Sequence, residues 1–260
     1  MKNQKVSVLM AAYNAEPYIE ASVNSIREQT YSNLEIIVCD DCSTDGTWRV
    51  LEKLASQDAR IRLLKNQKNS FAACSRNRCL EIAEGDYIAI QDADDISAPD
   101  RIEKLVGALE ANPQYDFVSC EEGLFAENPT DCYKTIQHKR YPTKKDFLRG
   151  MCFCHAATLF RKSALVGVGG YPIDDKIKRH EDYMMFMNLY ANGSCGMNID
   201  DCLYFYRVDE QAMRRRKFKA RIEECKIRYR GFRKMKLMPL GLPFIFVPIV
   251  GFVLQKLGRK

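Results

Sequence analysis

Residues 34–47, LEIIVCDDCSTDGT, join an apolar run that ends on Asp40 and Asp41 to a turn-rich segment that leads into a helical pattern. A second stretch, residues 85–95 (GDYIAIQDADD), has the same design, because its apolar run also ends on carboxylates. Continuous apolar runs are typical of strands buried on both faces of a parallel sheet. In an open α/β sheet, ligands lie outside the carboxyl ends of the strands. The two stretches therefore predict one acidic site at one edge of such a sheet.

The second stretch places three carboxylates within four residues, at Asp92, Asp94 and Asp95. Crowded carboxylates repel one another unless a positive charge joins them. Mg²⁺ and Mn²⁺ prefer oxygen ligands, commonly one or two carboxylates together with substrate phosphates. Capping of helices or loops explains isolated aspartates such as Asp45 and Asp100, but it does not explain this cluster. The cluster predicts a metal-assisted enzyme that acts on a nucleotide-linked substrate.

Strand-like and helix-like patterns alternate through the first half of the chain and continue less regularly after it. This alternation predicts right-handed βαβ connections and an α/β fold with a mainly parallel sheet flanked by helices. The expected strands are Val6–Ala12, Leu34–Cys39, Ile61–Leu64, Tyr87–Gln91, Phe117–Cys120, Ala156–Phe160 and Cys202–Tyr206. The expected helices are residues 17–29, 44–54, 72–83, 100–111, 162–166, 181–190 and 214–236, and residues 121–145 show no clear pattern.

With 260 residues and 46% hydrophobic composition, the chain can bury a full core and suits one large α/β domain with an appendage. It has eleven cysteines, and its first apolar run is too short for a signal peptide, so we expect free thiols in a reducing cytosol. Cys152, Cys154 and His155 form a C-x-C-H pattern without a second ligand pair at zinc-site spacing. Buried thiols are therefore the favoured interpretation of this pattern.

Residues 211–260 differ in character from the body of the chain. Residues 214–236 hold 12 Lys or Arg against two Glu, and residues 237–254 hold no charge but include three prolines. A spanning helix needs about 20 apolar residues, and proline interrupts helices. We therefore expect a surface-lying or re-entrant anchor that the basic segment draws to anionic lipid. The alternative is a C-terminal hairpin packed on the body. Nucleic-acid binding by the basic segment is not expected, because it gives no role to the adjoining uncharged stretch.

Five motifs, in this order and spacing, resemble the family 2 glycosyltransferases of the GT-A fold. They are VSVLMAAYNAEPYIEASVNSIREQTYSNLEIIVCDDCSTDGT at residues 6–47, SRN at 75–77, GDYIAIQDADDISAPDR at 85–101, VGGYP at 168–172 and HEDY at 180–183. The resemblance implies a Rossmann-like GT-A domain over residues 1–210. Residues 211–260 would then form a basic and hydrophobic helical appendage that associates with a membrane.

The resemblance also assigns roles to individual residues. The nucleotide and donor contacts would be Ala11, Tyr13, Asn14, Asp41, Arg76, Asp92 and Arg207, with Arg214 as a further candidate for the diphosphate. Asp41 matches the family's uracil-binding aspartate, where a carboxylate accepts the ring N–H in a charge-assisted bond. The D-x-D motif would bind Mn²⁺ or Mg²⁺ through Asp94, Asp92 and Asp95. The acceptor-side loop would be Gly169, Gly170 and Tyr171.

Asp182 matches the family's catalytic base, and Glu181 is the runner-up, because neighbours on a helix point in different directions. An inverting transfer needs a carboxylate that takes the proton of the acceptor hydroxyl as the hydroxyl attacks. Two departures from the family pattern concern the donor side. Phe71 stands where relatives often carry glycine, and Asp209 stands where many relatives place a histidine.

We therefore expect a metal-dependent, inverting enzyme that moves one sugar from a nucleotide-sugar, with UDP as the favoured nucleotide, in surface glycan synthesis. The Q-x-x-R-W signature of processive members is absent. The acceptor would be a saccharide or a polyprenyl-linked glycan, met at the inner face of the cell membrane through residues 214–256. A nucleotidyltransferase is an alternative, although residues 6–15 lack the glycine that its signature needs. A non-catalytic nucleotide-sugar or membrane-binding module is another.

Overall fold

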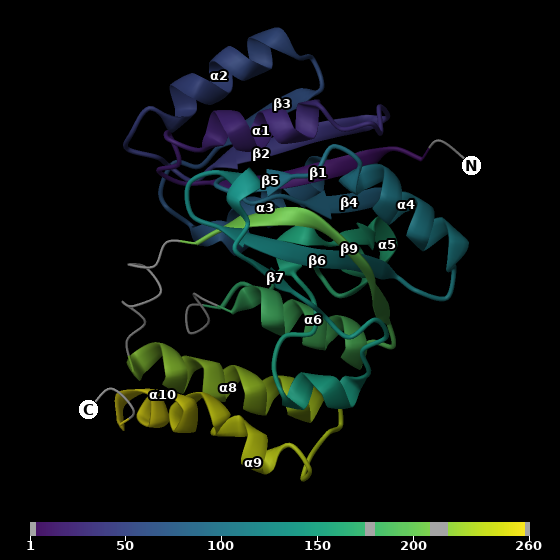
Figure 1. The fold of residues 1–260 in the computed structure, drawn as a ribbon, viewed down its shortest axis with the longest axis vertical. Helices are drawn as coiled ribbons and strands as arrows, with labels where there is room; N and C mark the ends of the chain where they lie inside the picture. Colours follow the sequence, from purple (N-terminus) through teal and green to yellow (C-terminus); the bar gives the residue numbers. More distant parts are fainter. Residues whose placement is uncertain (1–3, 175–179, 209–217, 258–260) are drawn as a thin grey trace.

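A computed structural model describes residues 4–174, 180–208 and 218–257, which fold around a mixed β-sheet (Figure 1). Across these residues the strand order is β3-β2-β1-β4-β8-β6-β9-β5, and β7 pairs with β6. The strands are β1 (Val6–Ala12), β2 (Leu34–Asp40), β3 (Ile61–Lys65), β4 (Tyr87–Ile90), β5 (Ile96–Ser97), β6 (Phe117–Phe125), β7 (Lys134–Ile136), β8 (Leu159–Arg161) and β9 (Gly196–Arg207).

Helices flank this sheet and extend the molecule beyond it. They are α1 (Ile19–Arg27), α2 (Thr47–Gln57), α3 (Phe71–Ile82), α4 (Arg101–Ala111), α5 (Lys162–Gly167), α6 (Glu181–Ala191), α8 (Phe218–Lys234), α9 (Leu242–Ile245) and α10 (Val247–Leu257). Short 3₁₀ turns are η1 (Pro129–Asp131), η2 (Lys144–Leu148) and η3 (His155–Ala157). The expected α/β fold with flanking helices is confirmed.

The predicted parallel half of the sheet is also confirmed. Strands β3, β2, β1 and β4 run parallel, and Val8 of β1 lies in register with Ile36 of β2 and with Ala89 of β4. The residues of β2 and β4 are buried throughout, as expected for continuous apolar runs. Because parallel strands end at the same edge, Asp41 after β2 and Asp92 after β4 both lie at the carboxyl edge of the sheet.

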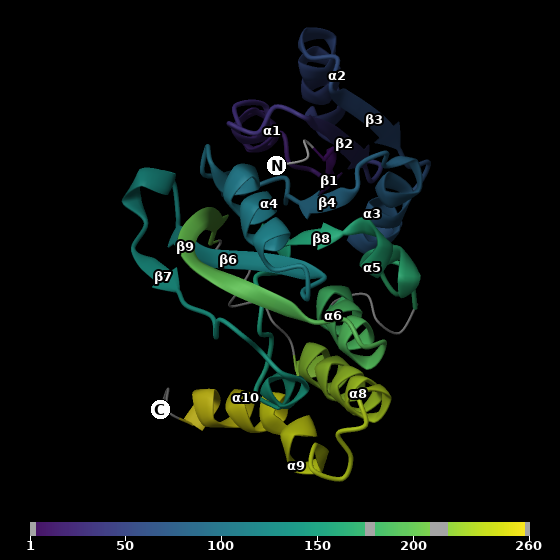
Figure 2. The same ribbon diagram turned by 90° about the vertical axis from the view of Figure 1, so that its right-hand side faces the viewer.

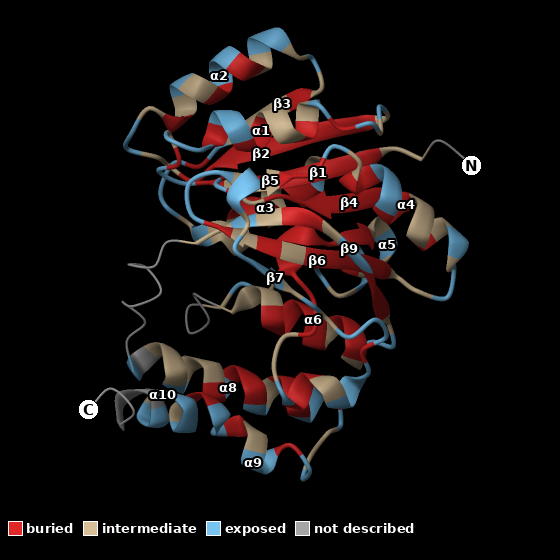
Figure 3. Cartoon of the chain, viewed as in Figure 1, coloured by how far each residue is buried: buried red, intermediate tan, exposed pale blue. Residues whose placement is uncertain are grey.

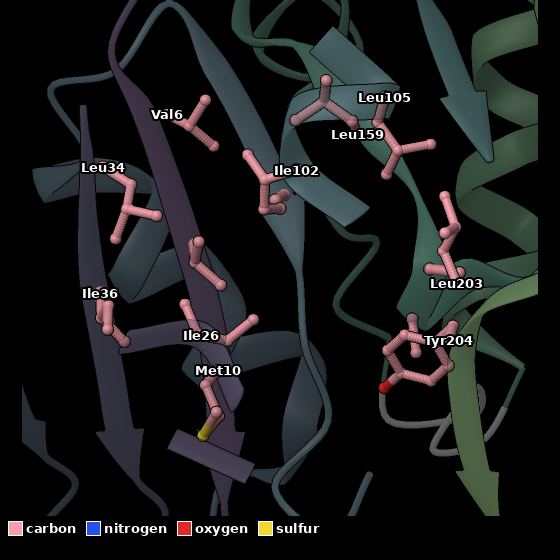
Figure 4. Packing of buried hydrophobic residues seen from close by; sticks show 14 of the residues in the cluster. Val6, Met10, Ile26, Leu34, Ile36, Ile102, Leu105, Leu159, Leu203 and Tyr204 are labelled. Carbon is pink, nitrogen blue, oxygen red and sulfur yellow. The ribbon is translucent and has the colours of Figure 1, made fainter. Parts of the chain in front are cut away.

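Two layers of helices cover the two faces of the sheet, because side chains alternate along each strand. On one face, Val6 and Ile36 pack with residues of α1, α2 and α4. Figure 4 shows part of this cluster, including Ile102 of α4. On the opposite face, Leu9 and Ile37 pack with α3, α5 and α6. The first helix layer holds β4 from one side, and the second brings the start of α6 toward the strand ends.

The second half of the sheet is mixed. Strand β8 pairs antiparallel with both β4 and β6, whereas β6 and β9 pair parallel. Both β6 and β9 are longer than their apolar runs suggested. The register of β6 against β9 shifts around Glu121, and such a bulge breaks the alternation on which a sequence pattern depends. The short strands β5 and β7 were not expected.

The C-terminal helices form the appendage at the end of the molecule opposite α2 (Figures 1 and 2). Helix α8 packs on α6, and α9 and α10 pack on α8. Ile227 and Phe232 of α8 and Ile245 of α9 are buried in the same apolar cluster as α6. The inward face of these helices thus packs on α6. The expected domain boundary at residue 210 lies outside the described residues.

The outward face of the appendage differs from its inward face. Val250 and Leu254 of α10 are 53% and 62% exposed, and Figure 3 shows exposed residues along α9 and α10. In the described ranges, no helix combines the length and the apolar character that crossing a bilayer requires.

Candidate active site

The loops after β1 and β2 are joined to each other where the nucleotide contacts are expected. Ala11 lies in β1, and Tyr13 just beyond it is 48% exposed. Asn14 adopts a left-handed backbone conformation with φ 49°, which asparagine tolerates better than most residues. Its Oδ1 accepts the N–H of Thr44 at 2.8 Å, and its own N–H donates to Ser43 Oγ at 3.0 Å. Tyr13 and Asn14 therefore share the loop after β1, and Ala11 lies in the strand that leads into it.

Asp41 is buried at the end of β2, and one of its carboxylate oxygens is already engaged. Oδ1 accepts from Asn66 Nδ2 at 2.6 Å and from the Ser70 N–H at 2.8 Å. Oδ2 accepts no hydrogen bond from any residue that the structure describes. The carboxylate is thereby held in a fixed orientation with one oxygen left for a donor such as the ring N–H of a base.

Arg76 on α3 joins the carboxylate cluster after β4 to the first residue of α6. Its Nη2 donates to Asp92 Oδ1 at 2.7 Å, and its Nη1 donates to Glu181 Oε1 at 3.3 Å. The guanidinium lies 5.6 Å from the ring centroid of Tyr171. Burial opposes its charge, but Asp92, Tyr171 and Glu181 together outweigh this effect, so the pKa of Arg76 is raised. One expected donor contact, one residue of the acceptor-side loop and one candidate base therefore surround a single buried cation.

Asp95 is buried and holds the turn that carries the D-x-D motif. Its Oδ2 accepts from the Tyr204 hydroxyl at 2.9 Å, and its Oδ1 accepts from the Arg207 N–H at 2.7 Å. The Tyr204 hydroxyl in turn accepts the N–H of Asp92 at 3.1 Å. Burial, followed by Asp92 and Asp94, raises the pKa of Asp95 to about 8. Tyr204 was not expected at the site, because a tyrosine inside a strand pattern predicts only packing.

Asp94 differs from its two neighbours because its carboxylate is not engaged. It accepts no hydrogen bond from another residue in the described part of the chain, and the residue is exposed at the surface of the turn. Partial desolvation of the carboxyl group, followed by the charge of Asp92, raises its pKa to about 6. Among the three carboxylates, Asp94 is thus the one that no hydrogen bond from another described residue engages, and it can meet a cation.

Arg207 at the end of β9 fastens the D-x-D turn with part of its guanidinium. Nε donates to the carbonyl of Asp94 at 3.0 Å, and Nη1 donates to the carbonyls of Ala126 and Glu127 at 2.9 and 3.2 Å. The guanidinium also lies 4.6 Å from the ring centroid of Tyr18. Among the described residues, Nη2 has no hydrogen-bond partner and remains the nitrogen that could bind a diphosphate. Arg214, the other candidate for that role, lies outside the described residues.

The two candidate bases open α6. Asp182 Oδ1 accepts the N–H of Tyr183 at 2.7 Å, and His180 just before the helix has φ 69°. Burial raises the pKa of Asp182, and burial with the charge of Asp182 raises that of Glu181. Glu181 is partnered by Arg76, whereas Asp182 faces no cation within hydrogen-bond distance in the described chain. The ion pair with Arg76 thereby distinguishes Glu181 from Asp182, which the sequence ranked only by resemblance to the family.

The acceptor-side loop is held by Asn77 of α3. Asn77 Nδ2 donates to the carbonyl of Tyr171 at 2.9 Å, and its Oδ1 accepts the Tyr171 N–H at 2.8 Å. Gly169 and Gly170 have φ of 79° and 71°, and a Cβ on Gly170 would lie 2.6 Å from Asn77 Oδ1. The loop therefore needs glycine at Gly170 for close approach to α3. Asn77 belongs to the quoted SRN motif, but no role was assigned to it.

The Tyr171 side chain points inward, so this loop can present backbone rather than a phenol to a ligand. Its hydroxyl is hydrogen-bonded to His155 Nε2 at 2.8 Å, and the residue is 1% exposed. Burial, followed by the charge of Arg76, lowers the pKa of His155 to about 3. Cys152 and Cys154 are free and buried, as the thiol interpretation expected. His155 thus supports the loop and does not belong to a metal cluster with these cysteines.

Comparison with known proteins agrees with this geometry. The family model for glycosyl transferase family 2 matches residues 7–168. EpsE of Bacillus subtilis (strain 168), a provisionally named glycosyltransferase, is 36% identical over 95% of this chain and 88% of its own length. WfaP of Escherichia coli, named as a UDP-Glc:alpha-D-GlcNAc-diphosphoundecaprenol beta-1,3-glucosyltransferase, is 32% identical over 85% of this chain and 84% of its own.

A solved structure shares the fold. S. aureus TarS 1–349 in complex with UDP-GlcNAc superposes with a TM-score of 0.74 at 20% identity, covering 93% of this chain and 72% of the TarS chain. The family assignment selects glycosyl transfer over nucleotidyl transfer and over a non-catalytic binding module. The chain is a glycosyltransferase with a GT-A fold, and it belongs to glycosyl transferase family 2.

Proposed function

We propose that this enzyme transfers one sugar, with inversion, from a UDP-sugar to a hydroxyl of a saccharide or lipid-linked acceptor in surface glycan synthesis. The contact of Arg76 with Asp92 at 2.7 Å and with Glu181 at 3.3 Å carries the proposal. It brings the donor-side carboxylates and the start of α6 to one place. A donor diphosphate and an acceptor hydroxyl could therefore meet between Asp94 and Asp182.

A UDP donor is supported by the state of Asp41 and by the relatives. Asp41 Oδ1 is occupied by Asn66 and Ser70, so Oδ2 is available for the ring N–H of uracil. The name of WfaP specifies UDP-Glc, and TarS was solved with UDP-GlcNAc. We assign Ala11, Tyr13 and Asn14 to the same nucleotide surface.

The carboxylates after β4 fit a divalent cation. The Asp94 carboxylate accepts no hydrogen bond from another described residue, and burial with the charge of Asp92 raises its pKa to about 6. Mg²⁺ and Mn²⁺ are commonly held by one or two carboxylates plus substrate phosphates. We assign Asp94 and Asp92 to the cation and Asp95 to the turn that presents them. When bound, the cation would stabilise the charge that develops on the departing diphosphate.

Asp182 is the proposed base. Its carboxylate would accept the proton of the attacking hydroxyl while the sugar leaves the diphosphate on the opposite face. Burial raises its pKa, which makes it a stronger base than an exposed aspartate. Glu181 is the less suitable base, because the Arg76 guanidinium already neutralises it at 3.3 Å.

The acceptor and the site of action are inferred from the appendage and one relative. The WfaP name specifies an acceptor carried on diphosphoundecaprenol, which is anchored in a membrane. Helices α9 and α10 expose apolar side chains beside the basic helix α8, a combination that suits the surface of an anionic bilayer. We propose a peripheral position on the inner face of the cell membrane.

Calorimetric binding of UDP, GDP, dTDP and CMP, with and without Mn²⁺, tests the donor assignment. We expect UDP to bind the wild type, and to bind it more tightly when Mn²⁺ is present. In Asp94→Asn, Mn²⁺ should no longer increase the affinity for UDP. The matched control is Asp201→Asn, which removes an exposed carboxylate far from β4 in the chain. Failure of all four nucleotides to bind the wild-type protein would contradict the proposal.

A further inference from the structure

A pocket of about 530 Å³ lies between α6, α8 and the loop that follows the acceptor-side motif. The loop contributes Pro172 and Asp174, and α6 contributes Met184 and Asn188. The remaining wall comes from the last two turns of α8. The volume of the pocket falls within the range of about 300–1,000 Å³ that is usual for small-molecule sites. None of the residues assigned above to the donor, the metal or the base lines it.

The pocket lies on the acceptor side of the proposed reaction site. Pro172 directly follows Tyr171 in the acceptor-side loop, and Met184 lies two residues after Asp182 on α6. A helix rises about 1.5 Å per residue, so the pocket begins within one turn of the proposed base. A molecule with its hydroxyl at Asp182 could extend along α6 into this pocket.

The α8 wall of the pocket is basic. Arg230 is paired with Asp174, its Nη1 lying 2.8 Å from the carboxylate. Lys234 Nζ donates to Asn188 Oδ1 at 2.9 Å. Arg233 is exposed, and its side chain makes no hydrogen bond or ion pair with any other described residue. Among the described lining residues, one carboxylate thus faces three cations, and two of these cations have no anionic partner there.

The other walls are suited to an amphipathic ligand. Met184, which lines the pocket, is buried, and Tyr229, which also lines it, is 43% exposed. Ile173, between the two loop residues that line the pocket, is 65% exposed. A guanidinium presents a planar fork that matches phosphate oxygens, and an ammonium adds a point charge. Cations beside apolar surface indicate an anion that is attached to an apolar or sugar group.

We propose that this pocket binds the phosphate or diphosphate group of a lipid-linked acceptor, through Arg233 and Lys234. The proposal rests on the transferase function above and specifies how the enzyme selects its acceptor. The acceptor's first sugar would then lie between the pocket and Asp182. A neutral saccharide would leave both cations without an anionic partner, so lipid-linked acceptors would be preferred.

The test uses farnesyl diphosphate as the probe and the full chain with UDP and Mn²⁺ added first, so that the donor site is filled. The test variant is the double substitution Arg233→Ala with Lys234→Ala. The matched control is Arg49→Ala with Lys53→Ala, which removes an exposed Arg and an exposed Lys from α2 at the other end of the molecule (Figure 1). We expect the test variant to bind farnesyl diphosphate about tenfold more weakly, as for a lost hydrogen bond to a charged group. The control should match the wild type, and farnesol should bind more weakly than farnesyl diphosphate.

Equal affinity of the test variant and the wild type for farnesyl diphosphate, or no binding by the wild type, would overturn the proposal. Vesicles of phosphatidylglycerol separate the two sources of phosphate. If the test variant loses vesicle binding yet keeps its affinity for farnesyl diphosphate, the pocket serves membrane phospholipid and the proposal is wrong. UDP affinity, measured in the same samples, is expected to stay unchanged in the variant. If the wild type does not bind UDP, the proposed donor is wrong. The proposal for the pocket is tested separately, because farnesyl diphosphate binding is measured directly.

Discussion

Arg76 Nη2 lies 2.7 Å from Asp92 Oδ1, and this contact ties α3 to the end of β4. The same guanidinium reaches Glu181 Oε1 at 3.3 Å, on the first residue of α6. A buried charge is stable only when it is paired. Arg76 therefore fixes the position of the donor-side carboxylates relative to the helix that carries the proposed base.

Replacement of Arg76 should destabilise the fold as well as weaken donor binding. Arg76→Ala leaves two carboxylates facing each other without a cation, and loss of one partner of a buried pair costs about 3 kcal/mol or more. Urea unfolding measures this loss. The control is Arg49→Ala, which breaks an exposed pair with Glu16 and should cost at most about 1 kcal/mol. Equal losses in the two variants would show that Arg76 does not hold the site together.

The two carboxylates that open α6 should differ in their effect on transfer. Asp182→Asn should lower the transfer rate about 100-fold or more, which is the usual contribution of a general base. It should leave the affinity for the nucleotide unchanged. Glu181→Gln keeps a side chain of the same shape beside Arg76 and should have a smaller effect on the rate. Single-turnover consumption of the donor sugar measures both variants, and wild-type turnover by Asp182→Asn would remove Asp182 from the base role.

Asn77 should act on the acceptor side alone. Asn77→Ala leaves the Tyr171 N–H and carbonyl without their partner, which costs about 1–3 kcal/mol when such groups are buried. The loop with Gly169 and Gly170 then loses its support from α3. We expect a raised KM for the acceptor and an unchanged affinity for the nucleotide. Asn77→Asp, which can accept the Tyr171 N–H but cannot donate to its carbonyl, should give an intermediate KM; a changed nucleotide affinity would contradict a role on the acceptor side.

The first half of the fold was predictable because β1, β2 and β4 are mainly apolar runs that are followed by polar or turn-forming residues. The second half was less so. Glu121 and Glu122 continue β6 beyond its apolar run, where a bulge permits them, so the pattern ended the strand too early. Antiparallel β8 depends on its neighbours in the sheet, and a short sequence window does not contain them. The inward face of α8 was hidden for a similar reason, because only Ile227 and a few other apolar residues interrupt its charges.

The candidate site was predictable where chemistry is concentrated in sequence. Asp92, Asp94 and Asp95 stand out as a cluster, but their different tasks follow only from partners distant in the chain. Tyr204, more than 100 positions away, accepts the N–H of Asp92 and donates to Asp95. No local pattern distinguishes such a tyrosine from an ordinary strand residue. The pocket against α8 could not be predicted either, because it exists only when the appendage packs on α6.

His155 should make the stability of the protein depend on pH. Its pKa of about 3 in the folded state, mainly an effect of burial, lies below the usual value of about 6.5. The unfolded chain therefore binds the proton first, and stability present above pH 6.5 is lost as the pH falls toward 3, by up to about 1.4 kcal/mol per pH unit. His155→Gln should lack this part of the loss between pH 6.5 and 5, and carboxylates that titrate in this range, such as Asp94 with a pKa of about 6, are the same in both proteins. Denaturant unfolding at several pH values checks this, and parallel curves for the two proteins would contradict it.

Membrane attachment should depend on the outward face of α10, because Val250 and Leu254 lie one turn apart there and are 53% and 62% exposed. Charges on both, in Val250→Asp with Leu254→Asp, should weaken binding to phosphatidylglycerol vesicles about tenfold or more, since burial of one such side chain contributes about 1.5–3 kcal/mol. Val166→Asp on α5, where the side chain is also 53% exposed, is the control and should bind as the wild type does. The remaining attraction of α8 for anionic lipid should decrease with added salt. Sedimentation with vesicles measures these effects, and wild-type binding by the double variant would assign membrane attachment to the basic helix alone.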